Sequence, residues 1–211
     1  DLEIRGAGDL LGGEQSGFIN EIGFETYQKI LSEAIDELKE KEFKDLYEGT
    51  EHEKKDFVKE TVLDTDFELL FPDDYINNIT ERLNLYTKLN QLNTEAELQQ
   101  FEKELIDRFG ELPEQVVDLL NSVRIKWIAI KMGLERVVMK KNKLVGYFVS
   151  DQQSAYYQSP VFTKVLQYVQ NHPQRVTMKE KKTRNGLRLL LTFDRITSVN
   201  RALDALAPFR E

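Results

Sequence analysis

The hydrophobic pattern of this chain changes its period at Gly133, and that change constrains the fold more than any other feature. Between residues 75 and 133, apolar residues recur at helical spacing, whereas beyond Gly133 they alternate in short runs. Helices followed by mixed elements, without regular strand–helix–strand alternation, are typical of α+β proteins. The sequence therefore predicts an α+β domain with a mainly antiparallel sheet and several packed helices, preceded by a glycine-rich segment and a helix.

Capping signals divide the helical region into three predicted helices. Thr94 and Glu97 form a capping box at the start of the second helix, and Gly110 ends it. Pro113 lies in the first turn of the third helix, and Gly133 supplies its left-handed cap. The predicted ranges are about 75–92, 94–110 and 113–133. The residues expected on their buried stripes include Ile79, Leu83, Tyr86, Leu89 and Trp127.

Strands are predicted on both sides of these helices. One begins near Val58 and ends at the turn Pro72-Asp73-Asp74, whose two carboxylates are interpreted as turn and helix-cap residues. After Gly133 we expect strands at 137–139 and 144–149, a helix from 160 to before 173, and a hairpin at 175–193. Asn185-Gly186 predicts a type I′ turn in that hairpin. A last helix is expected to end near residue 208.

The charge of the chain is concentrated in one segment. The net charge is −8, and residues 33–68 hold fourteen acidic against six basic residues, which leaves the remainder neutral. Such a chain lacks the basic face of a free-standing nucleic-acid binder. It has no cysteine and only two histidines, His52 and His172, so no metal site is predicted. Without a long apolar run or a signal peptide, a cytoplasmic protein is expected.

The order of these segments predicts three regions. Residues 1–45 hold the glycine-rich opening and an amphipathic helix of about 24–41, residues 46–56 form a charged linker, and residues 57–211 form the main domain. The opening string DLEIRGAGDLLGGEQSG contains five glycines but no lysine, so it does not match a phosphate-binding loop. Because so specialised a motif starts at residue 1, we expect the chain to be a fragment of a larger protein.

The opening string resembles the motif that follows the second motor lobe in two families of bacterial DNA translocases. These are the branch-migration helicases and the transcription-repair coupling factors. The string matches the pattern D-L-E-x-R-G-x-G-x-x-L-G-x-x-Q-S-G in full, and IGFETYQKILSEAIDELK, LLFPDDYI, ITERLNLYTKLNQ and LIDRFGELPEQV resemble the coupling factors. The resemblance covers residues 1 to about 135, and a C-terminal piece of a branch-migration helicase stays the alternative.

The resemblance implies roles for the whole parent protein. Arg5 and Gln15 fall on the polar positions of the translocation motif, with Gly6 and Gly8 beside them. The parent is expected to bind ATP and Mg²⁺ and to move on double-stranded DNA. It would displace stalled RNA polymerase and recruit UvrA, the damage-recognition ATPase of excision repair. The fragment has no nucleotide-binding motif, so no catalytic residue or cofactor is expected in it.

For residues 57–211 the resemblance implies a regulatory domain that masks the N-terminal repair-recruiting module of the same protein. Glu97, Glu104 and Asp107 are acidic at spacings of seven and three, which places them on or near one helix face. They form the candidate intramolecular interface, and a solvated helix face is the alternative interpretation. A second alternative for the whole domain is nucleic-acid binding through the basic hairpin 175–192. If the hairpin does not bind a nucleic acid, it is interpreted as a solvated hairpin tip. Its basic residues include Lys179, Lys181, Lys182, Arg184 and Arg188.

Overall fold

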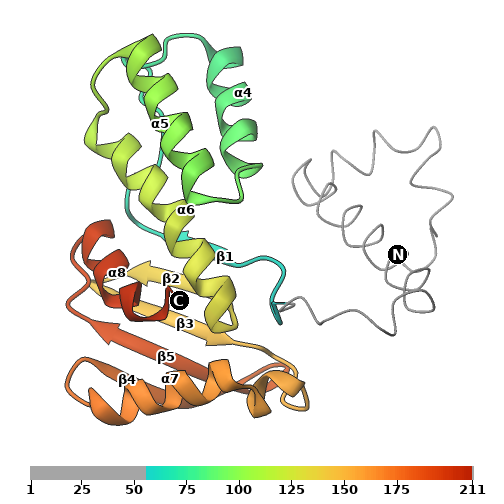
Figure 1. The fold of residues 1–211 in the computed structure, drawn as a ribbon. Helices are drawn as coiled ribbons and strands as arrows, with labels where there is room; N and C mark the ends of the chain where they lie inside the picture. The colour runs from blue at the N-terminus through green and yellow to red at the C-terminus, as the bar shows by residue number, and fades with distance from the viewer. Residues whose placement is uncertain (1–55, 211) are drawn as a thin grey trace, which may run out of the picture. The chain divides into compact units, whose positions relative to one another are not determined.

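A computed structural model describes residues 56–210 of the chain (Figure 1). Within this range the chain forms α-helices, short 3₁₀ turns and one sheet. The elements before Gly133 are β1 (Val62–Thr65), α4 (Ile79–Asn90), α5 (Glu95–Phe109) and α6 (Glu114–Met132). Those after it are β2 (Leu134–Lys140), β3 (Lys143–Phe148), η1 (Ala155–Gln158), α7 (Pro160–Asn171), β4 (Val176–Thr183), β5 (Gly186–Asp194), α8 (Val199–Leu206) and η2 (Ala207–Phe209).

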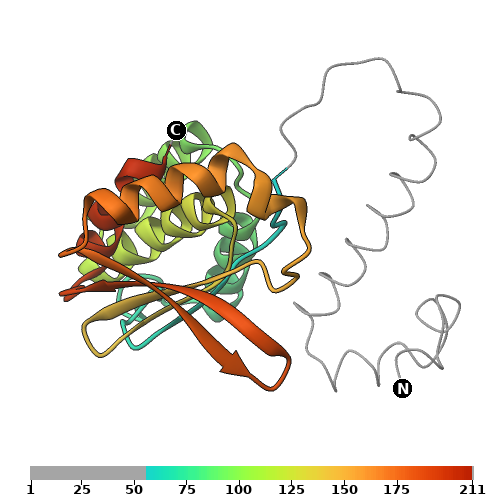
Figure 2. The same cartoon turned by 90° about the horizontal axis from the view of Figure 1, so that it is seen from below.

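The five strands form one mixed sheet in the order β1-β2-β3-β5-β4. β1 pairs with β2 in parallel, and the other three neighbouring pairs are antiparallel. Helices α6, α7 and α8 cover one face of this sheet (Figure 2), and side chains of alternating strand residues enter the core on that face only. The predicted α+β class with a mainly antiparallel sheet is confirmed.

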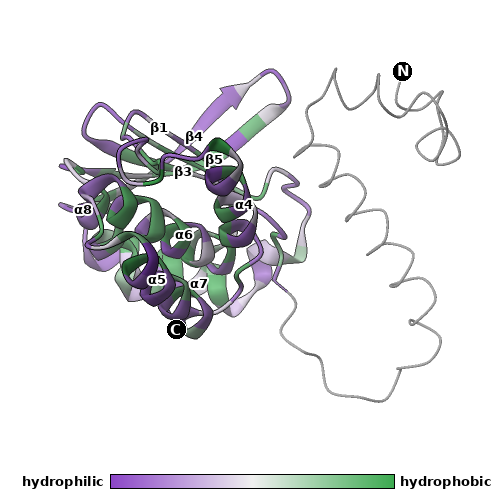
Figure 3. Cartoon of the chain, turned by 90° about the horizontal axis from the view of Figure 1, so that it is seen from above, coloured by the Kyte–Doolittle hydropathy of each residue, from purple (hydrophilic) through white to green (hydrophobic). Residues whose placement is uncertain are grey.

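The interior consists of two hydrophobic clusters that share helix α6. Val116, Leu119 and Leu120, near its start, pack with residues of α4 and α5. Ile125, Met132 and other residues near its end pack with the sheet, α7 and α8. A helix of 19 residues is about 28 Å long, enough to serve both clusters. Hydrophobic residues gather around α6 and the strands, while α5 is hydrophilic outside (Figure 3).

The predicted helix boundaries are mostly confirmed. The Thr94 side chain accepts a hydrogen bond from the backbone N–H of Glu97, and Gly110 follows the last residue of α5 with a φ of 89°. Pro113 is the N-cap of α6, one residue outside the predicted first turn, and Gly133 ends that helix in the left-handed region. Ser159 and Pro160 begin α7 as expected. Local capping chemistry therefore sets these ends.

Gly133 also makes room for a buried tyrosine. A Cβ atom on Gly133 would lie 2.2 Å from the Cε2 atom of Tyr156, which is fully buried. The Tyr156 hydroxyl donates a hydrogen bond to the carbonyl of Met132, one of the last carbonyls of α6, which have no partner within the helix. Burial raises the pKa of Tyr156, so the hydroxyl remains the proton donor. The contact joins the end of α6 to η1.

Helix α4 differs from its prediction in position and orientation. It begins after Asn78, four residues later than expected, because the Asn78 side chain caps the N–H of Glu81. Ile79 and Leu83, expected on the buried stripe, are 65% and 60% exposed. Leu85 and Leu89 face the core, since the preceding turn places Phe71 and Ile76 against this side.

Two strand predictions are also corrected. The first strand is limited to Val62–Thr65, where it pairs with β2, and the apolar residues 67–71 have no strand partner. In the β4–β5 hairpin the two-residue turn is Arg184-Asn185, one residue earlier than predicted. Neither turn residue has a positive φ, and Gly186 takes that conformation at 110°. The predicted type I′ turn is therefore wrong here. A turn with two positive φ angles occurs at Lys141-Asn142, between β2 and β3.

We expect Gly133→Ala to destabilise the domain by about 2–4 kcal/mol, from left-handed strain plus overlap with the Tyr156 ring. In a Tyr156→Leu background the overlap is removed, so the added cost should fall to about 1–2 kcal/mol. Wild type, the two single variants and the double variant form a double-mutant cycle, and urea unfolding of these four proteins measures both costs. Equal costs in the two backgrounds would show that the ring is not what excludes a side chain.

Candidate protein-interaction surface

Helix α5 lies on the outside of the helical layer, where its polar side faces solvent. It runs antiparallel to α4, as two ion pairs between the helices show. Arg108 near the end of α5 contacts Glu81 near the start of α4, and Lys88 near the end of α4 contacts Glu104. Leu98, Phe101 and Leu105 hold the opposite side of α5 in the core. This packing determines which acidic residues of α5 remain available to a partner.

Glu104 is engaged within the domain. Its carboxylate accepts a hydrogen bond of 2.6 Å from the ammonium of Lys88, while both side chains remain about half exposed. This hydrogen bond and the charge of Lys88 hold the pKa of Glu104 below its usual range. Lys88 also lies 6.0 Å from the ring centroid of Phe101. A partner that uses Glu104 therefore has to share or replace Lys88.

Glu97 and Asp107 are both exposed. The Glu97 carboxylate accepts a hydrogen bond of 3.0 Å from the Thr94 hydroxyl, so it belongs to the helix cap. Asp107 forms no ion pair with any residue in the range 56–210. The helical rise separates Glu97 from Glu104 by about 10 Å and Glu104 from Asp107 by about 4.5 Å. The structure thus places the three predicted residues along one helix, with Asp107 the least engaged.

A further ion pair fixes the start of α5 to α6. The guanidinium of Arg124 holds both carboxylate oxygens of Glu95, with Nε at 3.0 Å from each and Nη2 at 2.7 Å from Oε1. The hydrogen bond from Arg124 lowers the pKa of Glu95. The Arg124 guanidinium also donates a hydrogen bond to the side-chain carbonyl of Asn121. The side-chain amide of Asn121 in turn donates a hydrogen bond to Asn200 of α8. Sequence reasoning missed Lys88 and Arg124, because contacts between helices depend on their relative register.

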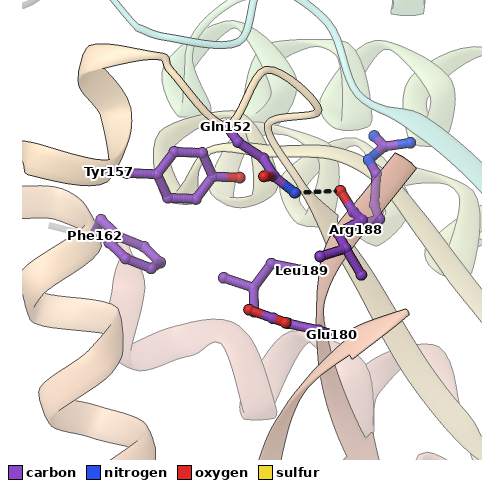
Figure 4. A pocket seen from close by; sticks show the side chains of 7 residues that line it. Gln152, Tyr157, Phe162, Glu180, Arg188 and Leu189 are labelled. Carbon is purple, nitrogen blue, oxygen red and sulfur yellow. Dashed lines mark hydrogen bonds between the residues drawn. The ribbon is translucent and has the colours of Figure 1, made fainter. Parts of the chain in front are cut away.

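A pocket of about 280 Å³ lies between the β4–β5 hairpin on one side and the loop before η1, η1 and the first turn of α7 on the other (Figure 4). Tyr157 and Phe162 line one side, and Glu180, Leu187 and Leu189 line the other. The Tyr157 hydroxyl is bonded to the carbonyl of Val149, and the pocket lining holds no nucleophile paired with a base. Its lining therefore offers no catalytic arrangement.

The structure also locates other residues that the sequence singled out. Asp73 lies in a turn and pairs with Arg82 at 3.2 Å, which confirms a turn role, but Asn78 is the cap of α4. Trp127 is only partly buried, against the α4–α5 cluster. Residues 56–210 contain no group of three or more potential metal ligands and no helix long and apolar enough to span a membrane. Arg5, Gly6, Gly8 and Gln15 lie outside the described residues.

Replacing Lys88 by Met should raise the pKa of Glu104 back towards 4.5, because its hydrogen-bond donor and nearest positive charge are removed. In the unchanged protein the pair stabilises the fold above pH 4.5, and its contribution is lost as the pH falls through the lowered pKa. NMR titration of the side-chain carboxyl carbons measures this pKa. Glu95 serves as the internal control, since its pKa depends on Arg124. An unchanged Glu104 titration would exclude Lys88 as the cause.

Comparison with known proteins identifies the domain. The sequence model of the TRCF domain family matches residues 65–159 of this chain. The transcription-repair-coupling factor of Escherichia coli is 40% identical over 138 residues, which cover 65% of this chain and 11% of that protein. The Rickettsia bellii factor is 29% identical over 96% of this chain and 17% of its own length. The Staphylococcus aureus factor is 32% identical over 91% of this chain and 15% of its own length.

The fold has a solved counterpart. The crystal structure of the C-terminal domain of a transcription-repair coupling factor matches with a TM-score of 0.52 and 21% identity, covering 72% of this chain and 95% of that chain. At this identity the likeness concerns the fold alone. The chain spans less than a fifth of the length of the curated relatives it matches. Residues 65–159 form a TRCF domain, and the chain belongs to the transcription-repair-coupling factor family.

Proposed function

We propose that this chain is the C-terminal regulatory part of a transcription-repair-coupling factor, and that its main domain masks the repair-recruiting N-terminal module of the same protein. The family match, the similarity to a C-terminal domain and the exposed acidic side of α5 support this proposal. Asp107 carries it furthest, because it is an exposed charge without an ion pair in residues 56–210. The expected partner surface is basic.

The parent protein would be an ATP-dependent translocase on double-stranded DNA that uses ATP and Mg²⁺. It would displace stalled RNA polymerase and recruit UvrA, the damage-recognition ATPase of excision repair. In this proposal the glycine-rich opening, with Arg5 and Gln15, transmits movement from the motor lobes. The chain itself contributes regulation and contacts and is not an enzyme. The TRCF match favours this parent over a branch-migration helicase.

The acidic side of α5 suits a contact that has to be released. A basic side chain of the module would bind Asp107 directly and would compete with Lys88 for Glu104. When the module is released, Lys88 can pair with Glu104 again, so the carboxylate has an ion-pair partner in the free domain as well. Exposed ion pairs are individually weak and depend on salt, so the contact can open when another interaction competes. Glu97 lies further along the same helix and would extend the acidic surface.

Charge reversal tests this function in the full-length protein. Glu104→Lys with Asp107→Lys should expose the repair-recruiting module, because a basic partner surface would then be repelled. We expect UvrA binding, measured by pull-down, to rise at least fivefold, and ATPase activity or DNA binding to rise with it. Lys88→Met should act in the opposite direction, since it frees Glu104 for the module.

The matched control is Asp151→Lys with Asp204→Lys, which makes the same change in net charge at two exposed residues, one in the loop after β3 and one on α8. This control should leave UvrA binding unchanged. If the α5 reversal also leaves binding and ATPase activity at wild-type values while the protein stays folded, this side of α5 is not the masking surface.

A further inference from the structure

The β4–β5 hairpin carries a positive charge that the domain does not neutralise. Lys179, Lys181, Lys182 and Arg184 are all exposed and form no ion pair within residues 56–210. Glu180 is the single acidic residue among them. Four unpaired cations within six residues are unusual in a chain whose net charge is −8. The hairpin therefore presents a local field of opposite sign to the whole chain.

The same cations lie on a free sheet edge. β4 is the last strand in the sheet order, and residues 177–183 have backbone partners on β5 only. In an edge strand, every second N–H and C=O group points away from the sheet and can pair with another strand. Lys179 and Lys181 project to one face of the sheet and Lys182 to the other, since side chains alternate. Charge and free hydrogen-bonding groups thus coincide.

The hairpin is held in place although its tip extends past β3. β5 pairs with β3 only at residues 190–194, so residues 186–189 project beyond it (Figure 2). There the Gln152 side chain donates a 2.6 Å hydrogen bond to the carbonyl of Leu187 (Figure 4), and the Arg188 guanidinium binds Glu135 at 2.7 Å. Both contacts come from the body of the domain. Because β4 pairs with β5 over its whole length, these contacts also limit the movement of β4, and its edge loses less conformational entropy when it binds a strand.

We propose that the outer edge of β4 binds an extended acidic segment of a partner protein, which adds to the sheet as a sixth strand. The free backbone groups of residues 177–183 would pair with the segment, and Lys179, Lys181 and Lys182 would select acidic side chains in it. Lysines on an edge strand repel another basic or identical strand, so they prevent pairing of two β4 edges. The surface is separate from α5 and does not depend on the masking function.

A peptide strand fits this edge better than a nucleic acid. A DNA phosphate backbone could use the four cations but has no hydrogen-bond donors for the outward carbonyls of β4. β4 and its turn carry no aromatic side chain on which a base could stack. Only an extended polypeptide offers alternating N–H and C=O groups together with acidic side chains at the period of a strand.

The test uses the 211-residue chain and an eight-residue peptide of alternating glutamate and valine, titrated at low salt. NMR should show shifts confined to residues 177–184, and hydrogen exchange should show new protection of β4 amides. Lys179→Glu with Lys181→Glu should weaken peptide binding by about five- to tenfold. The matched control, Lys103→Glu with Lys140→Glu, reverses two exposed lysines elsewhere and should leave the affinity within twofold. Lys179→Gln with Lys181→Gln removes the charges without reversing them and should give an intermediate loss of affinity. It serves as a second test in case the charge-reversed variant does not fold.

Three further probes separate strand addition from other kinds of binding. A fully N-methylated form of the peptide keeps the charges but cannot donate backbone hydrogen bonds, so it should not bind. Equal binding of both peptides would overturn strand addition. A single-stranded or duplex DNA oligonucleotide that binds the hairpin more tightly than the acidic peptide would replace the proposal with a phosphate-binding site. Absence of any peptide binding, or self-association of the chain through β4 in sedimentation, would also overturn it.

Discussion

The packing of α6 against two hydrophobic clusters is the interaction on which the rest of this domain depends. The first half of the helix supports α4 and α5, and the second half supports the sheet with α7 and α8. Without α6, both clusters would be open to solvent on one side, because each contains residues from a different part of this helix. At its C-terminal end, Gly133 reverses the chain into β2 and leaves space for Tyr156. The fold is therefore a helical layer and a one-sided sheet joined by one helix.

This arrangement separates two surfaces of opposite charge. The α5 surface is acidic and belongs to the helical layer, where Lys88 and Arg124 pair with Glu104 and Glu95. The β4 edge is basic and belongs to the far side of the sheet. Since the two surfaces lie on different elements, partners bound at both would not compete for the same residues. A regulatory domain that contacts several proteins would benefit from this separation.

Local chemistry explains the predictions that succeeded. Thr94, Gly110, Gly133 and Ser159 act on the backbone within a few residues, so their effects are readable from the sequence. The fold class followed from the change of hydrophobic period. The predictions that failed needed information from distant residues. Ile79 and Leu83 have helical spacing, yet they face solvent, because it is Leu85 and Leu89 of α4 that pack in the cluster with Phe71 and Ile76.

The candidate surface shows the same division. The acidic residues of α5 and their spacing were visible in the sequence, and so was the resemblance that suggested a partner. That Glu104 is held by Lys88, while Asp107 has no ion pair in the described range, follows from the antiparallel register of α4 and α5. The unpaired edge of β4 likewise follows from strand order. The sequence alone determined periodicity, caps and charge, because these act locally. Only the tertiary structure decided which charges are paired and which strand edge is free, because both depend on how distant segments pack.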